Sequence, residues 1–321
     1  SSPERGYRAR RGHPNIEAYT NLLDGYAKSG DLEKALGTLQ RMRKVGVQPN
    51  EYTYTCVISA LAKKRKIRQA IRLLDFMEGS GTMPTIVTYN AFISALARVS
   101  KNTVNTNEEY LSDGEDPWFV EQAIELLRRM VTKGVRPTVT TISILLECLA
   151  TCSRPRIGEA TAIVERFEKN GIIPMNDAKV NTAMIRVYGA AKDIKGALEV
   201  FRRIEEPDII AVNAFLDASC RTGEMKIAFD TFDHLFGPQA ASLDAITPDV
   251  ITFSIMISSQ LRLNTVRASK KAQGLYQDMR SRRIPPDISL VDKILSSMTR
   301  DGRLVLQKKD IQFTLKVLRD A

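Results

Sequence analysis

The sequence predicts an all-α protein, a right-handed superhelical solenoid of about eight helix-turn-helix repeats. An interval of 35 residues separates three sets of like residues: Tyr19, Tyr54 and Tyr89; Ala35 and Ala70; Pro49 and Pro84. A sequence that returns at such a fixed period is typical of stacked repeats. Every unit also carries two apolar faces with helical spacing, so each repeat is expected to be a helical hairpin.

The first repeat, about 16–50, shows how the sequence marks its two helices. The first apolar face is formed by Tyr19, Leu22, Leu23 and Tyr26. Gly30 and Asp31 then separate the helices, because Gly accepts the left-handed conformation that ends a helix and Asp caps the free N–H groups of the next one. The second apolar face is formed by Ala35, Leu36, Leu39 and Met42, and Gly46 and Pro49 end that helix.

The same pattern continues along the chain with less regular lengths. The expected bounds of the later repeats are about 51–85, 86–138, 139–177, 178–208, 209–249, 250–287 and 288–321. The last repeat is degenerate and predicts a terminal cap. Residues 1–14 form a basic, flexible lead, so the solenoid spans 15–321. The third repeat contains an acidic insertion at 101–118, which is most simply a solvated loop and alternatively a loop that docks a partner.

The composition offers little for catalysis or metal binding. The chain has 2 His and 4 Cys, and neither type is spaced like a metal site. Cys56, Cys148 and Cys220 lie in first helices, where a small buried apolar role is expected. The longest apolar run is too short to cross a bilayer. We therefore expect no enzyme, no cofactor, no small-molecule substrate and no membrane span.

Positive charge is the more informative feature. The formal net charge is +10, and the excess lies in the repeats because the lead contributes +3 and residues 101–117 contribute −4. In the repeat pattern, a cation ends the first helix in six units: Lys28, Lys63, Arg98, Arg221, Arg262 and Arg300. Such cations could complement a helix C-terminus, or they could follow a polyanion at one contact per repeat. The sequence leaves both interpretations open.

The motifs resemble the pentatricopeptide repeat (PPR) family. The resemblance rests on Val-Thr-Tyr-Asn-Ala-Phe-Ile at 87–93, Gly-Asp-Leu-Glu-Lys-Ala-Leu at 30–36, Met-Arg-Lys-Val-Gly-Val-Gln-Pro-Asn at 42–50 and Val-Ile-Thr-Phe-Ser-Ile-Met-Ile at 250–257. It covers about 16–310 and is similar to the P-type, binding-only branch, since no deaminase-like or nuclease extension follows Leu318. It implies sequence-specific binding of single-stranded RNA, one base per repeat.

The resemblance also implies which residues recognise the bases, namely the fifth and the last residue of each repeat. These pairs are Thr20 with Asn50, Thr55 with Thr85, Asn90 with Thr138, Ser143 with Asp177 (or Met175), Thr182 with Asp208, Asn213 with Asp249, and Ser254 with Asp287. By resemblance, Thr with Asn favours A, Thr or Ser with Asp favours G, and Asn with Asp favours U. We expect the fifth side chains on the exposed side of the first helix; capping of helix starts is the alternative.

The second residue of a repeat is apolar in the family and lies between bases. Here Val87, Ile210 and Ile251 match that pattern, whereas Glu17, Thr140, Lys179 and Ser289 depart from it. Phosphate contacts are assigned to Lys28, Lys63, Arg98, Arg221 and Arg262. The leading hypothesis is an RNA-binding adaptor for RNA processing, stability or translation in a chloroplast or mitochondrion. The alternative is a structural subunit that contacts other proteins of an organellar complex, with little recognition of RNA sequence.

Overall fold

A computed structural model describes residues 15–103, 118–152, 154–237, 246–263, 265–298 and 317. Within these ranges the chain forms 15 α-helices and no β-strand, which confirms the predicted all-α class. None of the helices in these ranges is both long enough and apolar enough to cross a membrane. The chain divides into two compact units, residues 1–153 and 154–321, and each is described by itself. The predicted lead at 1–14 lies outside the described residues.

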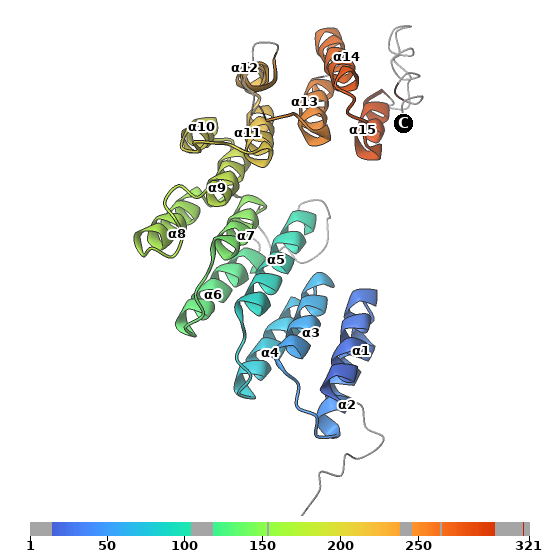
Figure 1. The fold of residues 1–321 in the computed structure, drawn as a ribbon, viewed down its shortest axis with the longest axis vertical. Coiled ribbons are helices and arrows are strands. Elements are labelled where there is room, and N and C mark those ends of the chain that lie inside the picture. The colour runs from blue at the N-terminus through green and yellow to red at the C-terminus, as the bar shows by residue number, and fades with distance from the viewer. Residues whose placement is uncertain are drawn as a thin grey trace, which may run out of the picture. The chain divides into compact units, whose positions relative to one another are not determined.

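The first unit contains three helical hairpins and one further helix. Its helices are α1 (Ile16–Ser29), α2 (Leu32–Lys44), α3 (Glu51–Lys63), α4 (Ile67–Gly79), α5 (Ile86–Thr103), α6 (Trp118–Thr132) and α7 (Val139–Ala150). Helices α1, α3, α5 and α7 pack side by side, and α2, α4 and α6 form a second row against them (Figure 1). The predicted helical hairpins therefore stack through their first helices.

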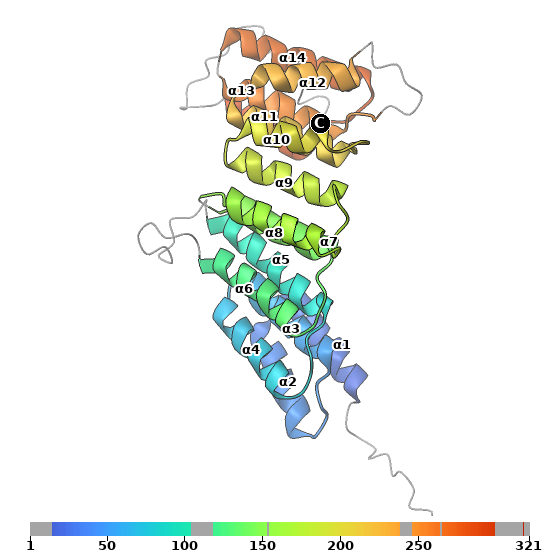
Figure 2. The ribbon, with the colours of Figure 1, turned by 90° about the vertical axis from the view of Figure 1, so that its left-hand side faces the viewer.

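The second unit repeats this arrangement. Its helices are α8 (Ile157–Lys169), α9 (Ala178–Ala190), α10 (Ile194–Arg202), α11 (Ile209–Thr222), α12 (Met225–Phe236), α13 (Val250–Arg262), α14 (Val266–Ser281) and α15 (Ile288–Met298). Helix α9 packs on α11, α11 on α13 and α13 on α15. Helices α9 to α14 lie across the view in nearly parallel layers (Figure 2). The row of first helices thus continues within this unit.

Local signals end and begin these helices as the sequence predicts. Gly30 has a φ of 78° and its N–H donates to the carbonyl of Tyr26, so it ends α1 in the left-handed conformation. The side chain of Asp31 accepts the N–H of Lys34 and caps α2. This turn confirms the expected stop and start between the two helices of the first repeat.

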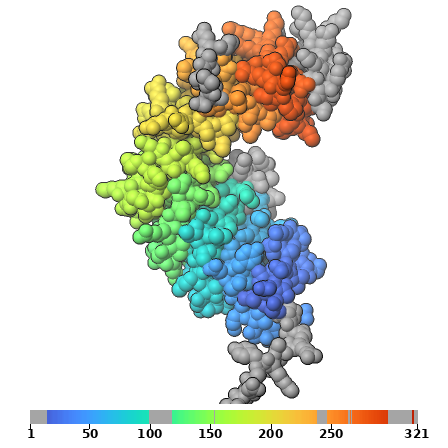
Figure 3. Space-filling model, in the orientation of Figure 1, coloured from blue at the N-terminus to red at the C-terminus, as the bar shows by residue number. Residues whose placement is uncertain are grey.

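Each hairpin buries one aromatic or large apolar residue against one small residue. Tyr19, Tyr54, Tyr89 and Phe253 are all buried, as predicted from their spacing. The facing second helices contribute alanines with no exposed surface: Ala35, Ala70, Ala123, Ala160, Ala197, Ala228 and Ala272. A methyl side chain lets two helices approach closely. The residues that repeat along the sequence are therefore those at the helix contacts. In the space-filling view, the first unit shows the resulting consecutive bands from blue to green (Figure 3).

The insertion in the third repeat begins later than predicted. Helix α5 continues to Thr103, so residues 101–103 are helical rather than loop. The apolar face of α5 ends earlier, and the polar segment that follows can still satisfy its backbone hydrogen bonds as helix. Residues 104–117, which carry the acidic part of the insertion, lie outside the described residues. Both interpretations of the insertion remain predictions.

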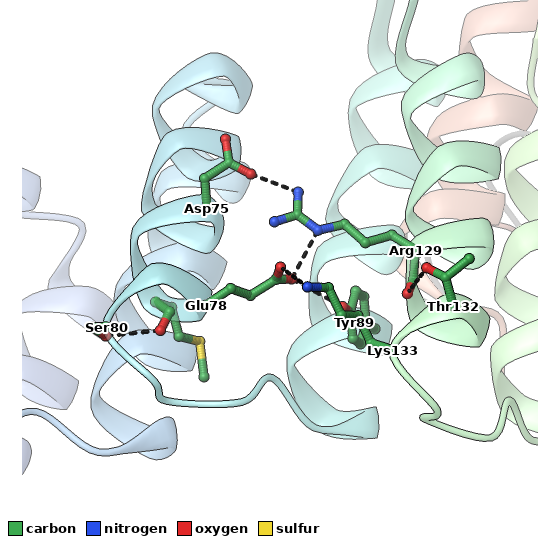
Figure 4. Close-up of polar contacts among 8 residues, drawn as sticks. Asp75, Glu78, Ser80, Tyr89, Arg129, Thr132 and Lys133 are labelled. Atoms are coloured by element: carbon green, nitrogen blue, oxygen red, sulfur yellow. Dashed lines mark hydrogen bonds and ion pairs between the residues drawn. The ribbon is translucent and has the colours of Figure 1, made fainter.

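An ion-pair cluster joins α4 to α6 within the first unit. Arg129 Nε lies 2.8 Å from Glu78 Oε1, and Arg129 Nη1 lies 2.7 Å from Asp75 Oδ1. Lys133 Nζ lies 3.1 Å from Glu78 Oε2, and Tyr89 Oη donates to Glu78 Oε1 at 3.3 Å. Figure 4 shows the guanidinium of Arg129 between the two carboxylates. Burial opposes ionisation of Glu78, but the hydrogen bonds from Arg129 and Lys133 outweigh it and lower the pKa of this carboxyl.

We expect Glu78→Gln to lower the free energy of unfolding of the first unit by about 2 kcal/mol, because it leaves a largely buried guanidinium without its main counter-charge. A lowered folded-state pKa means that the contribution is present above the ordinary pKa of 4.5 and is lost as the pH falls from there through the lowered pKa of the folded state. Urea unfolding and hydrogen exchange of α4 and α6, followed from neutral pH down to about pH 3, measure this difference.

The matched control is Glu125→Gln on α6. Glu125 and Arg128 form an ion pair at 3.5 Å in which the side chains are 62% and 70% exposed. Loss of such an exposed pair should lower the free energy of unfolding by less than about 0.5 kcal/mol. Equal losses for the two variants would show that the cluster around Glu78 does not hold α4 against α6.

Candidate nucleic-acid interface

The predicted site residues recur on the first helices, which are neighbours in each unit. The second and fifth residues of a repeat lie in the first two turns of its first helix, and the last residue lies just before the next first helix. Because α1, α3, α5 and α7 are adjacent, as are α9, α11, α13 and α15, equivalent positions repeat along one surface within each unit.

The last residues of six repeats are helix N-caps, and Thr85 is the exception among the seven predicted ones. Asn50, Thr138, Asp177, Asp208 and Asp249 each accept a backbone N–H of the helix that follows. Asp287 accepts the N–H of Leu290 in the same way. The capping role that the sequence left open is therefore filled. All hydrogen bonds of the four aspartates go to Oδ1, so within the described residues each Oδ2 remains able to accept another donor.

Several of the fifth residues are buried, contrary to the prediction that they lie on the exposed side. Thr20, Thr182 and Asn213 are 9%, 6% and 7% exposed, because the neighbouring first helix covers them. Four hydroxyls donate to the carbonyl four residues earlier at 2.7–2.8 Å; they belong to Thr20, Thr55, Ser143 and Thr182. These hydroxyls use their only proton within the helix, so they can meet a ligand only as acceptors.

Asn213 and Asp249 contact each other directly. Asn213 Nδ2 donates to Asp249 Oδ1 at 3.1 Å, and Thr252 Oγ1 donates to Asn213 Oδ1 at 2.8 Å. Burial raises the pKa of Asp249, but hydrogen bonds from Thr252 and Asn213 outweigh it and lower the pKa below the usual range. The carboxylate therefore stays ionised at neutral pH. This is one predicted pair whose two members the structure joins by a hydrogen bond.

The second residues are exposed throughout. Val87, Ile210 and Ile251 are 67%, 56% and 56% exposed. Tyr52 occupies the same place in the second repeat and is 53% exposed, yet the sequence analysis did not single it out. Counting three residues back from Thr55 would have found it. Exposed apolar side chains at a fixed place are suited to stack on planar groups.

The predicted cations differ in their surroundings. Lys28 pairs with Asp24 at 2.6 Å and Arg221 pairs with Asp217 at 2.7 Å, each one turn away on the same helix. Lys63, Arg98 and Arg262 have no ion-pair partner among the described residues. These three keep their full charge for a ligand.

The predicted helix-end position holds only in part. Lys63 and Arg262 end α3 and α13, while Lys28 and Arg221 come one residue before the last in α1 and α11. The prediction is wrong for Arg98, which lies five residues before the end of α5 because that helix extends to Thr103. Arg300 lies outside the described residues.

A groove of about 630 Å³ in the second unit brings four predicted residues of one repeat together. Its lining includes Ile251, Ser254, Asp287 and Arg262, which are the second, fifth, last and cationic residues of the seventh repeat. Lys293 also lines the groove and its Nζ donates to Ser254 Oγ at 3.3 Å. Lys293 was not among the predicted residues, since no position of the repeat pattern indicates it.

Within the described residues, no group of three or more His, Cys, Asp or Glu is placed to hold a metal ion. Burial raises the pKa of Cys148 to about 12, so this residue is a protonated thiol at neutral pH. What recurs is a set of hydrogen-bonding groups, exposed apolar side chains and cations.

Family models match three segments of the chain. The model described as "PPR repeat family" matches residues 14–63 and 53–98, and the model described as "PPR repeat" matches residues 182–209. These segments contain α1 to the first part of α5, and α9 to α10. The matches therefore fall in both compact units.

Two similar proteins are pentatricopeptide repeat-containing proteins of Arabidopsis thaliana. One is 30% identical over 126 residues, which are 39% of this chain and 25% of that protein. The other, named as chloroplastic, is 25% identical over 210 residues, which are 64% of this chain and 23% of that protein. A further matching Arabidopsis protein is named as mitochondrial. The chain thus spans about a quarter of the length of these relatives.

A solved structure shows a similar fold. The crystal structure of a variant of the pentatricopeptide repeat protein PPR10 with three cysteine-to-serine substitutions, in complex with an 18-nt psaJ RNA element, matches with a TM-score of 0.53 and 15% identity. The match covers 99% of this chain and 49% of that chain. At this identity the likeness establishes the repeat fold.

Proposed function

We propose that the chain is a protein of the PPR repeat family and that it binds single-stranded RNA sequence-specifically, one base per repeat; the family models match residues 14–98 and 182–209. The similar PPR10 structure is that of a complex with RNA. We assign the role to RNA processing, stability or translation in a chloroplast or mitochondrion, in line with the names of the relatives. The proposal gives the chain no catalytic step and no cofactor.

The groove of the seventh repeat is the observation that carries this proposal. It collects Ile251, Ser254, Asp287 and Arg262 on one surface, although Asp287 is 36 residues from Ile251 in the chain. An apolar side chain can stack on a base, the hydroxyl and the carboxylate can meet its edge, and the guanidinium can meet a phosphate. These are the groups that recognition of one nucleotide requires.

The other repeats are assigned the same roles by position. Base recognition is assigned to Thr20 and Asn50, Thr55 and Thr85, Asn90 and Thr138, Ser143 and Asp177, Thr182 and Asp208, Asn213 and Asp249, and Ser254 and Asp287. Val87, Ile210, Ile251 and, newly, Tyr52 stack on bases. Lys63, Arg98 and Arg262 contact phosphates more strongly than Lys28 and Arg221, because the latter two are already paired with aspartates.

The alternative function is a scaffold in an organellar complex. It is favoured by the capping role of the last residues and by the burial of Thr20, Thr182 and Asn213, which could serve helix packing alone. The two functions differ in whether binding depends on the RNA base. A scaffold does not need to distinguish one base from another, whereas a sequence-specific RNA-binding repeat must.

Competition binding tests the proposal directly. A labelled random-sequence single-stranded RNA is bound to the chain and displaced by unlabelled single-stranded RNA, double-stranded RNA or single-stranded DNA. We expect single-stranded RNA to compete best and the affinity to fall with rising salt, since phosphate contacts release counterions. Equal competition by double-stranded RNA would contradict the proposal.

A further inference from the structure

We infer that a buried threonine, Thr252, is a positioning residue that sets the base specificity of the sixth repeat by fixing the amide of Asn213. Thr88 has the same role for Thr55 in the second repeat. The inference rests on the proposed function, because it concerns how the recognising side chain is oriented. Neither threonine belongs to the second, fifth or last residues of the repeats, so the repeat pattern assigned them no role.

Threonine recurs at the third residue of four repeats and is fully buried in each case. The four residues are Thr53, Thr88, Thr141 and Thr252, all with 0% exposure. Each lies in the first turn of a first helix. Thr53, Thr88 and Thr252 also contact the fifth residue of the preceding repeat. A hydroxyl buried this deeply must find partners within the protein.

The hydrogen bonds of Thr252 have one consistent direction. Its Oγ1 accepts the backbone N–H of Asp249 at 3.1 Å. Its single proton lies near Asn213 Oδ1 at 2.8 Å and near Asp249 Oδ1 at 2.9 Å. Asp249 Oδ1 already receives the N–H of Thr252 at 2.8 Å and Nδ2 of Asn213 at 3.1 Å. Donation to Asn213 Oδ1 therefore satisfies every group in the cluster.

This arrangement permits one orientation of the Asn213 amide. A turn of the amide by half a rotation would leave the Thr252 hydroxyl without this acceptor and would bring two acceptor oxygens together at Asp249. In the permitted orientation, Nδ2 uses one proton for Asp249 and keeps its second proton as a donor. Thr252 and Asp249 together thus decide which hydrogen-bonding group the sixth repeat offers to a base, and Thr252 holds the oxygen end of the amide.

The second repeat contains the same device with a hydroxyl in place of the amide. Thr88 Oγ1 lies 2.7 Å from Thr55 Oγ1 and accepts the backbone N–H of Thr85 at 3.3 Å. Thr55 Oγ1 donates to the carbonyl of Glu51 at 2.8 Å, so it receives its bond from Thr88. The chain of bonds again runs from the cap, through the buried threonine, to the fifth residue.

The third repeat provides an internal contrast. Thr141 Oγ1 accepts the backbone N–H of its own cap, Thr138, at 3.1 Å and lies 3.2 Å from Thr138 Oγ1. The fifth residue that precedes it is Asn90, whose Oδ1 is buried and has no hydrogen-bond partner within the described residues. Thr141 therefore caps its helix without orienting Asn90. A buried threonine at this place can thus serve helix capping alone, without a role in recognition.

The test compares four RNAs that differ only in the base facing the sixth repeat, taken from sequences that the parent enriches from a random-sequence pool. The variants are Thr252→Val, which keeps the shape and removes the hydroxyl, and Thr252→Ser, which keeps the hydroxyl. We expect Thr252→Val to reduce the ratio of Kd values between preferred and disfavoured base by about fivefold, the equivalent of one neutral hydrogen bond. Thr252→Ser should restore the parental ratio.

The control is Ser219→Ala, which removes an equally buried hydroxyl that donates to the carbonyl of Phe215 within α11 and should leave discrimination unchanged at every position. Thr88→Val tests the same device at the base of the second repeat, so the inference stays testable if Thr252→Val does not fold. If Thr252→Val or Thr88→Val folds and keeps the parental ratio of Kd values between preferred and disfavoured base, the inference is overturned. If neither folds, failure of Thr252→Ser to keep the parental ratio would overturn it. A parent that does not discriminate at these positions would instead overturn the proposed function.

Discussion

Replacement of Lys63, Arg98 and Arg262 together by alanine is expected to weaken binding to all single-stranded RNAs on the order of a hundredfold, because each charge-assisted phosphate contact contributes about 1 kcal/mol. These cations have no ion-pair partner among the described residues, so RNA gains their full charge. The slope of log affinity against log salt should decrease by about 2, at about 0.7 for each contact to a single strand. Titration of one RNA at several salt concentrations measures both effects.

The matched control removes three exposed cations from second helices: Arg72 on α4, Arg128 on α6 and Lys226 on α12. This control has the same change in net charge and the same distribution between the two compact units. We expect it to change the slope little. If both triple variants lose affinity alike, binding follows net charge rather than a row of contacts on the first helices.

Asn213→Thr is expected to change the preferred base of the sixth repeat from U to G, since it creates the Thr with Asp pair of the fifth repeat. Discrimination should be on the order of 1–3 kcal/mol, by analogy with a good base contact in DNA. The change also removes the bonds of the amide to Asp249 and Thr252. Because Asn213 is buried, the free energy of unfolding should also fall by about 1 kcal/mol.

Asn181→Thr is the control for this substitution. Asn181 is a buried asparagine on α9, and its Nδ2 has no hydrogen-bond partner within the described residues. It lies one place before the fifth residue of its repeat, so the same change there should leave base preference unaltered. An unchanged preference in Asn213→Thr, beside a parent that does prefer U, would remove Asn213 from base recognition.

The fold follows from the sequence because its determinants are local and periodic. Tyr19, Tyr54 and Tyr89 each fill the space between two helices, so their spacing reports the packing directly. Gly30 and Asp31 likewise determine a turn through their own backbone and side-chain chemistry. The joining of α4 to α6 by Glu78 and Arg129 could not be foreseen, since these residues are 51 apart and an insertion lies between them.

The site was less predictable because it depends on contacts between repeats. A position in a pattern identified Asn213 and Asp249, but only the packing of α11 on α13 shows that they bond to each other. The burial of Thr20 and Thr182 comes from neighbouring first helices, which the pattern of one repeat does not contain. Lys293 reaches Ser254 from α15, in the repeat whose sequence is most degenerate.

The most direct test of the central claim is to sequence the RNAs that the chain enriches from a random pool of single-stranded RNA. Recognition of one base per repeat predicts one enriched motif, in which the fifth, sixth and seventh repeats specify adjacent G, U and G in chain order. It also predicts that Asn213→Thr changes only the middle base of that triplet. A pool that stays random after enrichment, or a motif in which Asn213→Thr changes no single base, would contradict the account and favour the scaffold.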